Sequence, residues 1–169
     1  YGNGGETYLM GYGMMYDGRR NMIKATFANG MYISLIEPVK MGPVGSSNDI
    51  DALIPKINLG AHLTYNGFEL HPTIGYAMSN YNEDFSSYKE TVTAFAAAIT
   101  AKYKVSDVCL KGQFGYGQNI GDYGFTVNSS NYYAGWDSAK EEVLDATAMN
   151  AYLQGTFQSF TGGFGYVAA

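Results

Sequence analysis

The stretch INLGAHLTYNGFELHPTIGYAM, residues 57–78, alternates apolar and polar side chains on both sides of a central Asn66-Gly67 pair. Because successive side chains of a strand point to opposite faces, the alternation predicts two β-strands. Asn-Gly tolerates the positive φ angles of a two-residue hairpin turn, so the two strands should form a hairpin. The apolar face of this hairpin carries Ile57, Leu59, Ala61, Leu63, Tyr65, Phe68, Leu70, Pro72, Ile74, Tyr76 and Met78. Such a face must touch either a protein core or a lipid bilayer.

The composition is compatible with strands that cross a membrane, but not with helices that do so. Only 15% of the 169 residues are charged, against about 25% in typical soluble domains. The sequence contains 22 Gly, 16 Tyr and 9 Phe, yet no apolar run approaches the length of a membrane helix, about 20 residues. A transmembrane strand needs only about 9–11 residues of alternating polarity, which several segments provide.

The charge and the motifs exclude several classes of function. The net charge is −5 and the basic residues are scattered, so nucleic acid is not an expected partner. Cys109 is the single cysteine, and the sequence has no CxxC motif or Cys/His cluster, so we expect no cofactor. Nucleophile-elbow, HExxH and P-loop motifs are absent as well, and we predict that the protein is not an enzyme.

The alternation recurs along the chain as a series of strands. Predicted strands cover residues 6–16, 21–27, 31–37, 54–65, 67–79, 90–103, 107–119 and 146–158, and another begins in the C-terminal GFGYVAA. Tight turns at Asn29-Gly30, Asn66-Gly67 and Ser106-Asp107 alternate with long polar segments at 39–53, 80–89 and 120–145. Short connections at one end and long ones at the other are typical of an up-and-down meander.

Two segments carry local predictions of a different kind. In residues 137–144, Ser138 and Glu141 have capping-box spacing, which predicts a short helix there or, failing that, a plain loop. Pro72 lacks a backbone N–H inside a predicted strand, which predicts a bulge or a break in the hydrogen-bond ladder.

The polar face favours lipid over a protein core as the neighbour of the apolar face. It is rich in Gly, Ala, Asn, Gln, Ser and Thr, whereas the solvent face of a soluble sandwich or lipocalin-like barrel is rich in Lys and Glu. Several strands also exceed the usual 5–6 residues by about twofold. Aromatic residues that could form an interfacial girdle lie near the tight turns at Phe27, Tyr32, Tyr65, Phe68, Tyr103 and Phe157, although Tyr32 has the opposite parity.

We therefore predict an all-β protein, an antiparallel up-and-down transmembrane β-barrel, with residues 1–169 in a single domain. A complete barrel of eight or ten strands, with an interior filled by side chains, stays open as an alternative. So does a soluble or surface-attached β-rich protein that binds a ligand or acts in adhesion through aromatic loops.

Three phrases of the sequence resemble the strand-turn-strand units of general porins: RRNMIKATFANGMYISLIEP, ALIPKINLGAHLTYNGFELHPTIGYAMSNYNED and ITAKYKVSDVCLKGQFGYGQNIGDYGF. They are most similar to the homotrimeric outer-membrane porins of sulfate-reducing and related Gram-negative bacteria. The resemblance implies a 16-stranded barrel in contact with the lipid bilayer and lipopolysaccharide, and passive diffusion of small hydrophilic solutes. About nine strands are predicted, and single-chain bacterial barrels have even strand numbers, so we expect an incomplete portion of such a barrel.

Parity assigns side chains to the two faces of this predicted barrel. The predicted pore-lining residues are Lys24, Lys56, Asn58, His62, Thr64, Glu69, His71, Thr73, Lys102, Lys111, Gln113, Asn150 and Gln154. The predicted lipid-facing residues are Ile57, Leu59, Leu63, Tyr65, Phe68, Leu70, Ile74, Tyr76, Leu110 and Phe114. The inward lysines outnumber the inward acids, which predicts a preference for small anions.

The hairpin register should bring His62 and His71 together on the inward face. They could form a pH-sensitive constriction, because two protonated imidazoles would lie about 5 Å apart, or they could simply be wetted by the lumen. A metal site would need further ligands, and none is evident from the sequence, so no metal is predicted. The small side chains of residues 94–100 could mark a subunit interface, and the segment 120–145 is the best candidate for a loop that folds into the channel.

Overall fold

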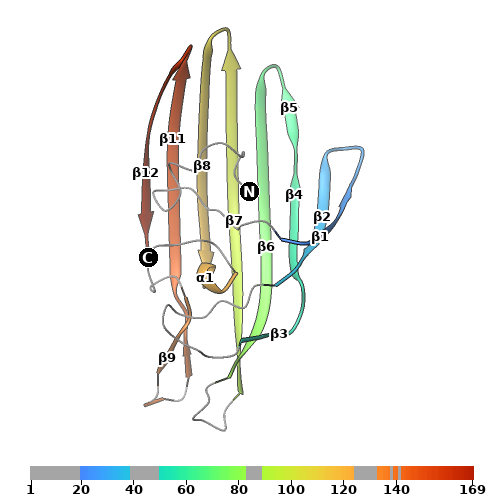
Figure 1. The fold of residues 1–169 in the computed structure, drawn as a ribbon, viewed down its shortest axis with the longest axis vertical. Coiled ribbons are helices and arrows are strands. Elements are labelled where there is room, and N and C mark those ends of the chain that lie inside the picture. The colour runs from blue at the N-terminus through green and yellow to red at the C-terminus, as the bar shows by residue number, and fades with distance from the viewer. Residues whose placement is uncertain (1–19, 39–49, 83–88, 124–132, 138, 141) are drawn as a thin grey trace.

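The computed structural model describes residues 20–38, 50–82, 89–123, 133–137, 139–140 and 142–169 (Figure 1). One large antiparallel sheet contains most of these residues. Its strands are β1 (Met22–Thr26), β2 (Met31–Ile36), β3 (Ile50–Ala52), β4 (Lys56–Ala61), β5 (Leu63–Tyr65), β6 (Phe68–Asn82), β7 (Lys89–Val105), β8 (Val108–Gln118), β11 (Thr147–Phe157) and β12 (Phe160–Ala168). A short helix, α1 (Ile120–Tyr123), follows β8, and β9 (Gly135–Asp137) pairs with β10 (Glu142–Leu144) in a separate hairpin.

The large sheet is an up-and-down meander, as predicted. Its strands follow the order β1-β2-β4-β6-β7-β8-β11-β12, and β3 and β5 both pair with β6 beside β4. Every predicted strand that falls within the described residues is present, whereas the predicted strand at 6–16 lies outside them. Over the described part of the chain the sheet is open, with β1 and β12 at its two edges. No helix in that part is long and apolar enough to span a membrane.

The tight turns gather at one end of the sheet because their residues accept positive φ angles. Asn66 and Gly67 have φ angles of 45° and 77°, and Ser106 has a φ of 49°. Gln158 (φ 51°) makes an equivalent turn between β11 and β12, which the sequence pattern did not reveal. These turns lie together at the upper end in Figure 1, opposite the long connections.

The turn between β1 and β2 differs from the predicted two-residue form. Gly30 alone has a positive φ, 83°, and its N–H donates to the Phe27 carbonyl at 3.0 Å. The loop thus contains Ala28 as well, a three-residue arrangement with glycine in the left-handed position. The Gly30 carbonyl then accepts a hydrogen bond from the His62 N–H at 2.8 Å, so this turn holds the neighbouring strand.

The ladder between β4–β5 and β6 breaks where Pro72 predicts. Gly60 pairs with Thr73 and Leu63 pairs with Leu70 in the same register, but the intervening residues form no bridge. Proline has no N–H to donate, so the neighbouring strand has no donor opposite it at Ala61. The His62 N–H points to the other side, where it donates to the Gly30 carbonyl and continues the register of β2 with β4.

The predicted helix at 137–144 is wrong, because β9 and β10 form a hairpin there. The Asp137 carboxylate accepts hydrogen bonds from the backbone N–H groups of Ala139 (3.0 Å) and Lys140 (3.3 Å). An aspartate that binds the N–H groups two and three residues on stabilises a turn as readily as a helix start. The predicted capping residues, Ser138 and Glu141, lie outside the described residues, and in the segment around them strand pairing of Trp136 with Val143 takes the place of the helix.

Asn119 fastens the two ends of the long connection between β8 and β11. Its side-chain amide donates to the Thr93 carbonyl (2.9 Å) and to Asp145 Oδ1 (2.7 Å), and its Oδ1 accepts from the Ala146 N–H (2.8 Å). Its own N–H donates to the Ala146 carbonyl at 2.7 Å. The residue is completely buried and has a φ of 51°, a conformation that Asn adopts more readily than most residues.

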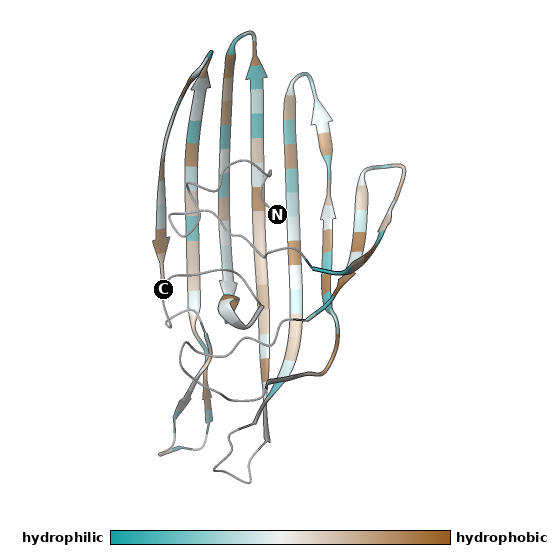
Figure 2. Cartoon of the chain, viewed as in Figure 1, coloured by the Kyte–Doolittle hydropathy of each residue, from teal (hydrophilic) through white to brown (hydrophobic). Residues whose placement is uncertain are grey.

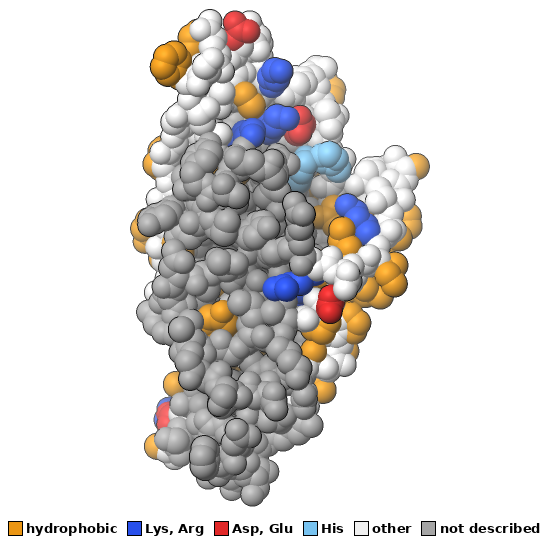
Figure 3. All heavy atoms as spheres, viewed as in Figure 1, with side chains coloured by type: hydrophobic (Ala, Val, Ile, Leu, Met, Phe, Trp, Pro, Cys, Tyr) orange, Lys and Arg blue, Asp and Glu red, His pale blue; other side chains and the backbone are white. Residues whose placement is uncertain are grey.

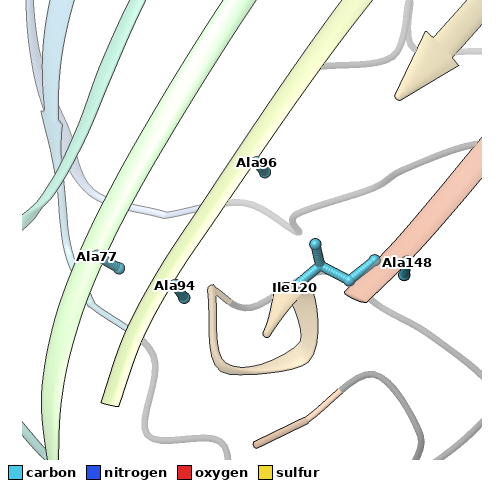
Figure 4. Close-up of a cluster of buried hydrophobic side chains, with 5 residues drawn as sticks. All are labelled: Ala77, Ala94, Ala96, Ile120 and Ala148. Carbon is cyan, nitrogen blue, oxygen red and sulfur yellow. The ribbon is translucent and has the colours of Figure 1, made fainter. Parts of the chain in front are cut away.

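The hydrogen bonds of Asn119 direct the following helix, α1, onto one face of the sheet. Ile120 packs against small side chains of β6, β7 and β11, namely Ala77, Ala94, Ala96 and Ala148 (Figure 4). A second small cluster joins Val92, Ala134 and Val143 on the same side of β7. Ala94 and Ala96 thus make room on this face for α1.

We predict that Gly30→Ala destabilises the protein by about 2 kcal/mol, because a Cβ in this left-handed backbone would strike the His62 carbonyl. The free energy of unfolding by guanidinium measures the effect. Gly162→Ala is the matched control, since no heavy atom lies within 4 Å of its added Cβ. It should change the unfolding free energy by less than about 0.5 kcal/mol. Equal effects of the two substitutions would contradict the close approach at Gly30.

We also predict that Asn119→Ala costs about 2–4 kcal/mol, because it removes three buried hydrogen bonds and leaves partners unsatisfied. Asn119→Asp should be equally harmful, since its carboxylate would lie against Asp145. Limited proteolysis of the 119–146 connection, compared with the unfolding free energy, measures the loss. Cleavage rates that match those of the unaltered chain would show that Asn119 does not fasten this segment.

Candidate functional site: the polar face of the sheet

The two faces of the large sheet differ sharply in chemistry. Large apolar side chains are exposed on one face, including Ile74 (52%), Phe114 (51%) and Leu153 (47%). On the opposite face polar side chains are buried, including Lys56 (1%), Asn58 (3%) and Gln154 (4%). The teal and brown bands along the strands in Figure 2 show the same alternation. This is the reverse of the arrangement in a water-soluble sheet, where the apolar face is the buried one.

The predicted lipid-facing residues lie on the exposed apolar face. Leu59, Leu63, Tyr65, Phe68, Ile74, Tyr76, Leu110 and Phe114 are exposed, whereas Ile57 and Leu70 are half-buried. An apolar groove of about 460 Å³ runs across this face, and Leu59, Pro72, Ile99 and Phe114 contribute to its walls.

The predicted pore-lining residues lie on the opposite face, which we call the polar face. Near the tight turns the polar side chains are accessible: Lys24, His62 and Thr64 are exposed, and Glu69, His71, Thr73, Lys102 and Lys111 are half-buried. Lys56, Asn58, Gln113, Asn150 and Gln154 are buried. Of these, Gln154 is in register with Lys111 and Gln113 with Thr100, near the turns, and the others lie farther away. The predicted set thus divides into an open part near the turns, with Gln113 and Gln154 as buried exceptions, and a covered part toward α1.

A charged row crosses the open part of the polar face. Glu69 is in register with Lys102, and Lys102 with Lys111, so the three side chains come from three adjacent strands. Lys102 Nζ donates to Glu69 Oε1 at 2.7 Å. Thr64 and Gln154 continue the row on either side. One lysine is thus balanced by the glutamate, and the row carries a small net positive charge.

The two histidines meet one residue row away from these charges. Their ring centroids lie 3.7 Å apart with the planes at 90°, which confirms the predicted pairing of His62 with His71. His71 Nε2 lies 4.0 Å from Glu69 Oε2 and has no hydrogen-bond partner among the described residues. In Figure 3 the histidine, lysine and acidic side chains lie close together in the upper part of the visible face.

A cavity of about 390 Å³ opens beside the histidines. Its walls are of mixed polarity and include Lys24, Tyr32, His71, Thr100 and Gln113. The hydroxyl, amide and imidazole groups of these walls can hydrogen-bond water and small polar solutes. The cavity therefore gives the polar face an aqueous, solute-sized recess near the tight turns.

Tyr32 is the member of this region that sequence reasoning left without a role. Its position in the strand places it on the polar face and not with the aromatic girdle of the apolar face. There its hydroxyl lies 3.1 Å from Thr73 Oγ1. Lys24 Nζ lies 4.0 Å from its ring centroid, a cation–π contact. The signal that predicts this position is Gly60, the register partner of Tyr32, whose missing side chain makes room for the ring.

Comparisons with protein-family models, with curated proteins and with solved structures found no match for this chain.

Proposed function

We propose that this protein is a bacterial outer-membrane porin, whose polar face lines a water-filled channel for small hydrophilic solutes. The observation that carries the proposal is the sidedness of the sheet: large apolar side chains are exposed on one face and polar side chains are buried on the other. In lipid the favourable position for Leu, Ile and Phe is the outer surface, and a barrel that conducts solutes needs a polar interior.

Two rows of aromatic side chains on the apolar face support a bilayer as its neighbour. Tyr65, Phe68 and Tyr103 form one row across β5, β6 and β7 beside the turns. Tyr76 and Phe95 form the second row, and the Phe95 ring lies 6.1 Å from that of Tyr116. Eight residues separate the rows along each strand, or about 27 Å of strand. A tilt of about 40° reduces this to about 21 Å, close to the apolar band of about 25 Å in outer-membrane barrels.

The strand lengths support the same reading. β6 contains 15 residues and β7 contains 17, and β8 and β11 contain 11 each. A tilted strand needs about 9–11 residues to cross the hydrocarbon core. Each of these central strands is therefore long enough to span a bilayer, and β6 and β7 are long enough to project beyond it.

The open edges at β1 and β12 support a larger assembly of strands. Unpaired edges in hydrocarbon leave backbone N–H and C=O groups unsatisfied, so a spanning sheet must close. We propose closure into a barrel like that of the general porins which the sequence resembles, with the described strands as one part of its wall. The resemblance also favours a homotrimer in contact with lipopolysaccharide.

The connection after β8 is well placed to narrow such a channel. Asn119 and Ile120 direct it onto the polar face, where it covers the small side chains of β6 and β7. The open part of the polar face near the turns, with its cavity beside His71, would then stay accessible to solutes.

A second candidate function is a soluble or surface-attached binding protein. The apolar groove across Leu59, Ile74 and Phe114 favours it, because a partner or an apolar ligand could cover that surface instead of lipid. Extraction separates the two candidates: release from cells by salt or alkali without detergent would contradict the porin.

Adjacent residues of β7 provide a matched test of sidedness at one membrane depth. Ile99 lies on the exposed face, midway between the aromatic positions Phe95 and Tyr103, and Thr100 lies on the polar face. We predict that Ile99→Lys hinders assembly into lipid vesicles by about 2–4 kcal/mol, the cost of a lysine near the bilayer midplane. Thr100→Lys should assemble normally. Better tolerance of lysine at 99 than at 100 would indicate a water-soluble protein.

Single-channel recording tests the conduction itself. We predict stepwise conductance in planar bilayers, weak preference for small anions, and reduced conductance in Thr100→Lys, whose side chain would enter the polar recess. Lys111→Gln should shift the reversal potential in a salt gradient toward cations, since it removes a charge from the row. A strongly cation-selective unaltered channel would contradict the predicted anion preference, and the absence of channels would contradict the porin.

A further inference from the structure

His62, Glu69 and His71 converge on one point of the polar face. Each offers one ligand atom, and the three atoms all lie within 4.8 Å of one another. Glu69 and His71 project from alternate positions of β6, and His62 comes from the break between β4 and β5. Sequence spacing paired the histidines but did not reveal Glu69 as their neighbour, because its side chain must lean along the strand to reach them.

We propose that these three side chains form a binding site for a divalent transition-metal ion such as Zn²⁺. Two imidazoles and one carboxylate are a common donor set for zinc, with a further position left for water. Donor atoms around tetrahedral zinc lie about 3.3 Å apart, given metal–ligand bonds of about 2.0–2.1 Å. The observed separations therefore need to shrink by roughly 1.5 Å at most, which side-chain rotations can provide.

The environment of His71 supports a bound ion at this point. Its Nε2 is buried and has no hydrogen-bond partner among the described residues. A buried polar atom without a partner costs about 1–3 kcal/mol. Glu69 Oε2 lies 4.0 Å from this nitrogen, too far for a hydrogen bond. A metal ion between the two atoms would satisfy both.

Lys102 binds the other oxygen of the Glu69 carboxylate. Its Nζ donates to Glu69 Oε1 at 2.7 Å, which leaves Oε2 as the oxygen that faces His71. Such a second contact orients a ligating carboxylate, but the positive charge also opposes a cation nearby. The site should therefore bind its ion with moderate affinity, and removal of the lysine charge should strengthen binding.

The polypeptide around the three side chains is well fixed. The His62 N–H is held by the Gly30 carbonyl at 2.8 Å, and β6 is paired on both sides at Glu69. The half-exposed position beside the polar cavity gives an ion access from solvent. Imidazole-rich donor sets select Zn²⁺, Ni²⁺ and Cu²⁺ over the oxygen-seeking Mg²⁺ and Ca²⁺.

Zinc titration of the whole purified chain in detergent tests the proposal, independently of any channel activity. We expect one saturable Zn²⁺ site per chain, with affinity reduced at least tenfold by His62→Gln, Glu69→Gln or His71→Gln, and no competition by Mg²⁺. Lys140→Gln, in the turn between β9 and β10 with Asp137 and Glu142 as its ion-pair partners, is the charge-matched control away from the site and should leave the affinity within about twofold. Lys102→Gln should increase the affinity. Absence of saturable binding, or binding unchanged by the three ligand substitutions, would overturn the proposal.

A spectroscopic measurement on the unaltered chain keeps the test free of folding effects in the variants. With Cu²⁺ as the probe, electron paramagnetic resonance should show hyperfine coupling to two imidazole nitrogens. Coupling to fewer than two nitrogens would overturn the proposed ligand set. Failure of the metal proposal leaves the bilayer recordings unaffected, and failure of the porin proposal leaves the titration unaffected.

Discussion

The structure depends on one continuous register across its central strands. Along β6, β7, β8 and β11 each residue faces its partner without a slip, so side chains of one kind align across the sheet. Because the side-chain period of a strand is two, a one-residue shift in any strand would move its large apolar residues to the polar face. The sidedness, the aromatic rows and the charged row of Glu69, Lys102 and Lys111 all follow from this register.

Two local features protect that register where the chain departs from regular strand structure. At Pro72 the ladder toward β4 and β5 is interrupted, but pairing resumes at Leu70 in the same register, and on the other side the His62 N–H donates to the Gly30 carbonyl. At the end of β8, Asn119 satisfies the backbone where the chain leaves the sheet and returns as β11. In both places a hydrogen bond to a neighbouring segment holds the chain where regular strand pairing stops.

The polar face combines two environments that strand parity alone treats as equivalent. Toward the turns its side chains are accessible and charged, and they surround a recess. Toward α1 the face combines buried polar side chains such as Asn58 and Asn150 with small ones such as Ala94 and Ala96, and Ile120 packs on the small ones. A small side chain on this face can leave open space, or it can be covered by a neighbouring segment. Which of the two occurs depends on the path of the connection after Asn119.

The sequence by itself determined the strands, the meander, the two faces and the meeting of His62 with His71. These depend on a period of two and on short turns, which are local properties. Local reasoning failed at 137–144, where the spacing of Ser138 and Glu141 predicts a helix but β9 and β10 form a hairpin with a turn at Asp137. Only the tertiary structure showed that Ile120 packs on the alanines and that Asn119 binds both ends of the connection between β8 and β11. It also showed that the Tyr32 ring lies over Gly60 and that Glu69 lies close to the histidines. Each of these depends on side-chain direction or on contacts between distant segments, which periodicity does not encode.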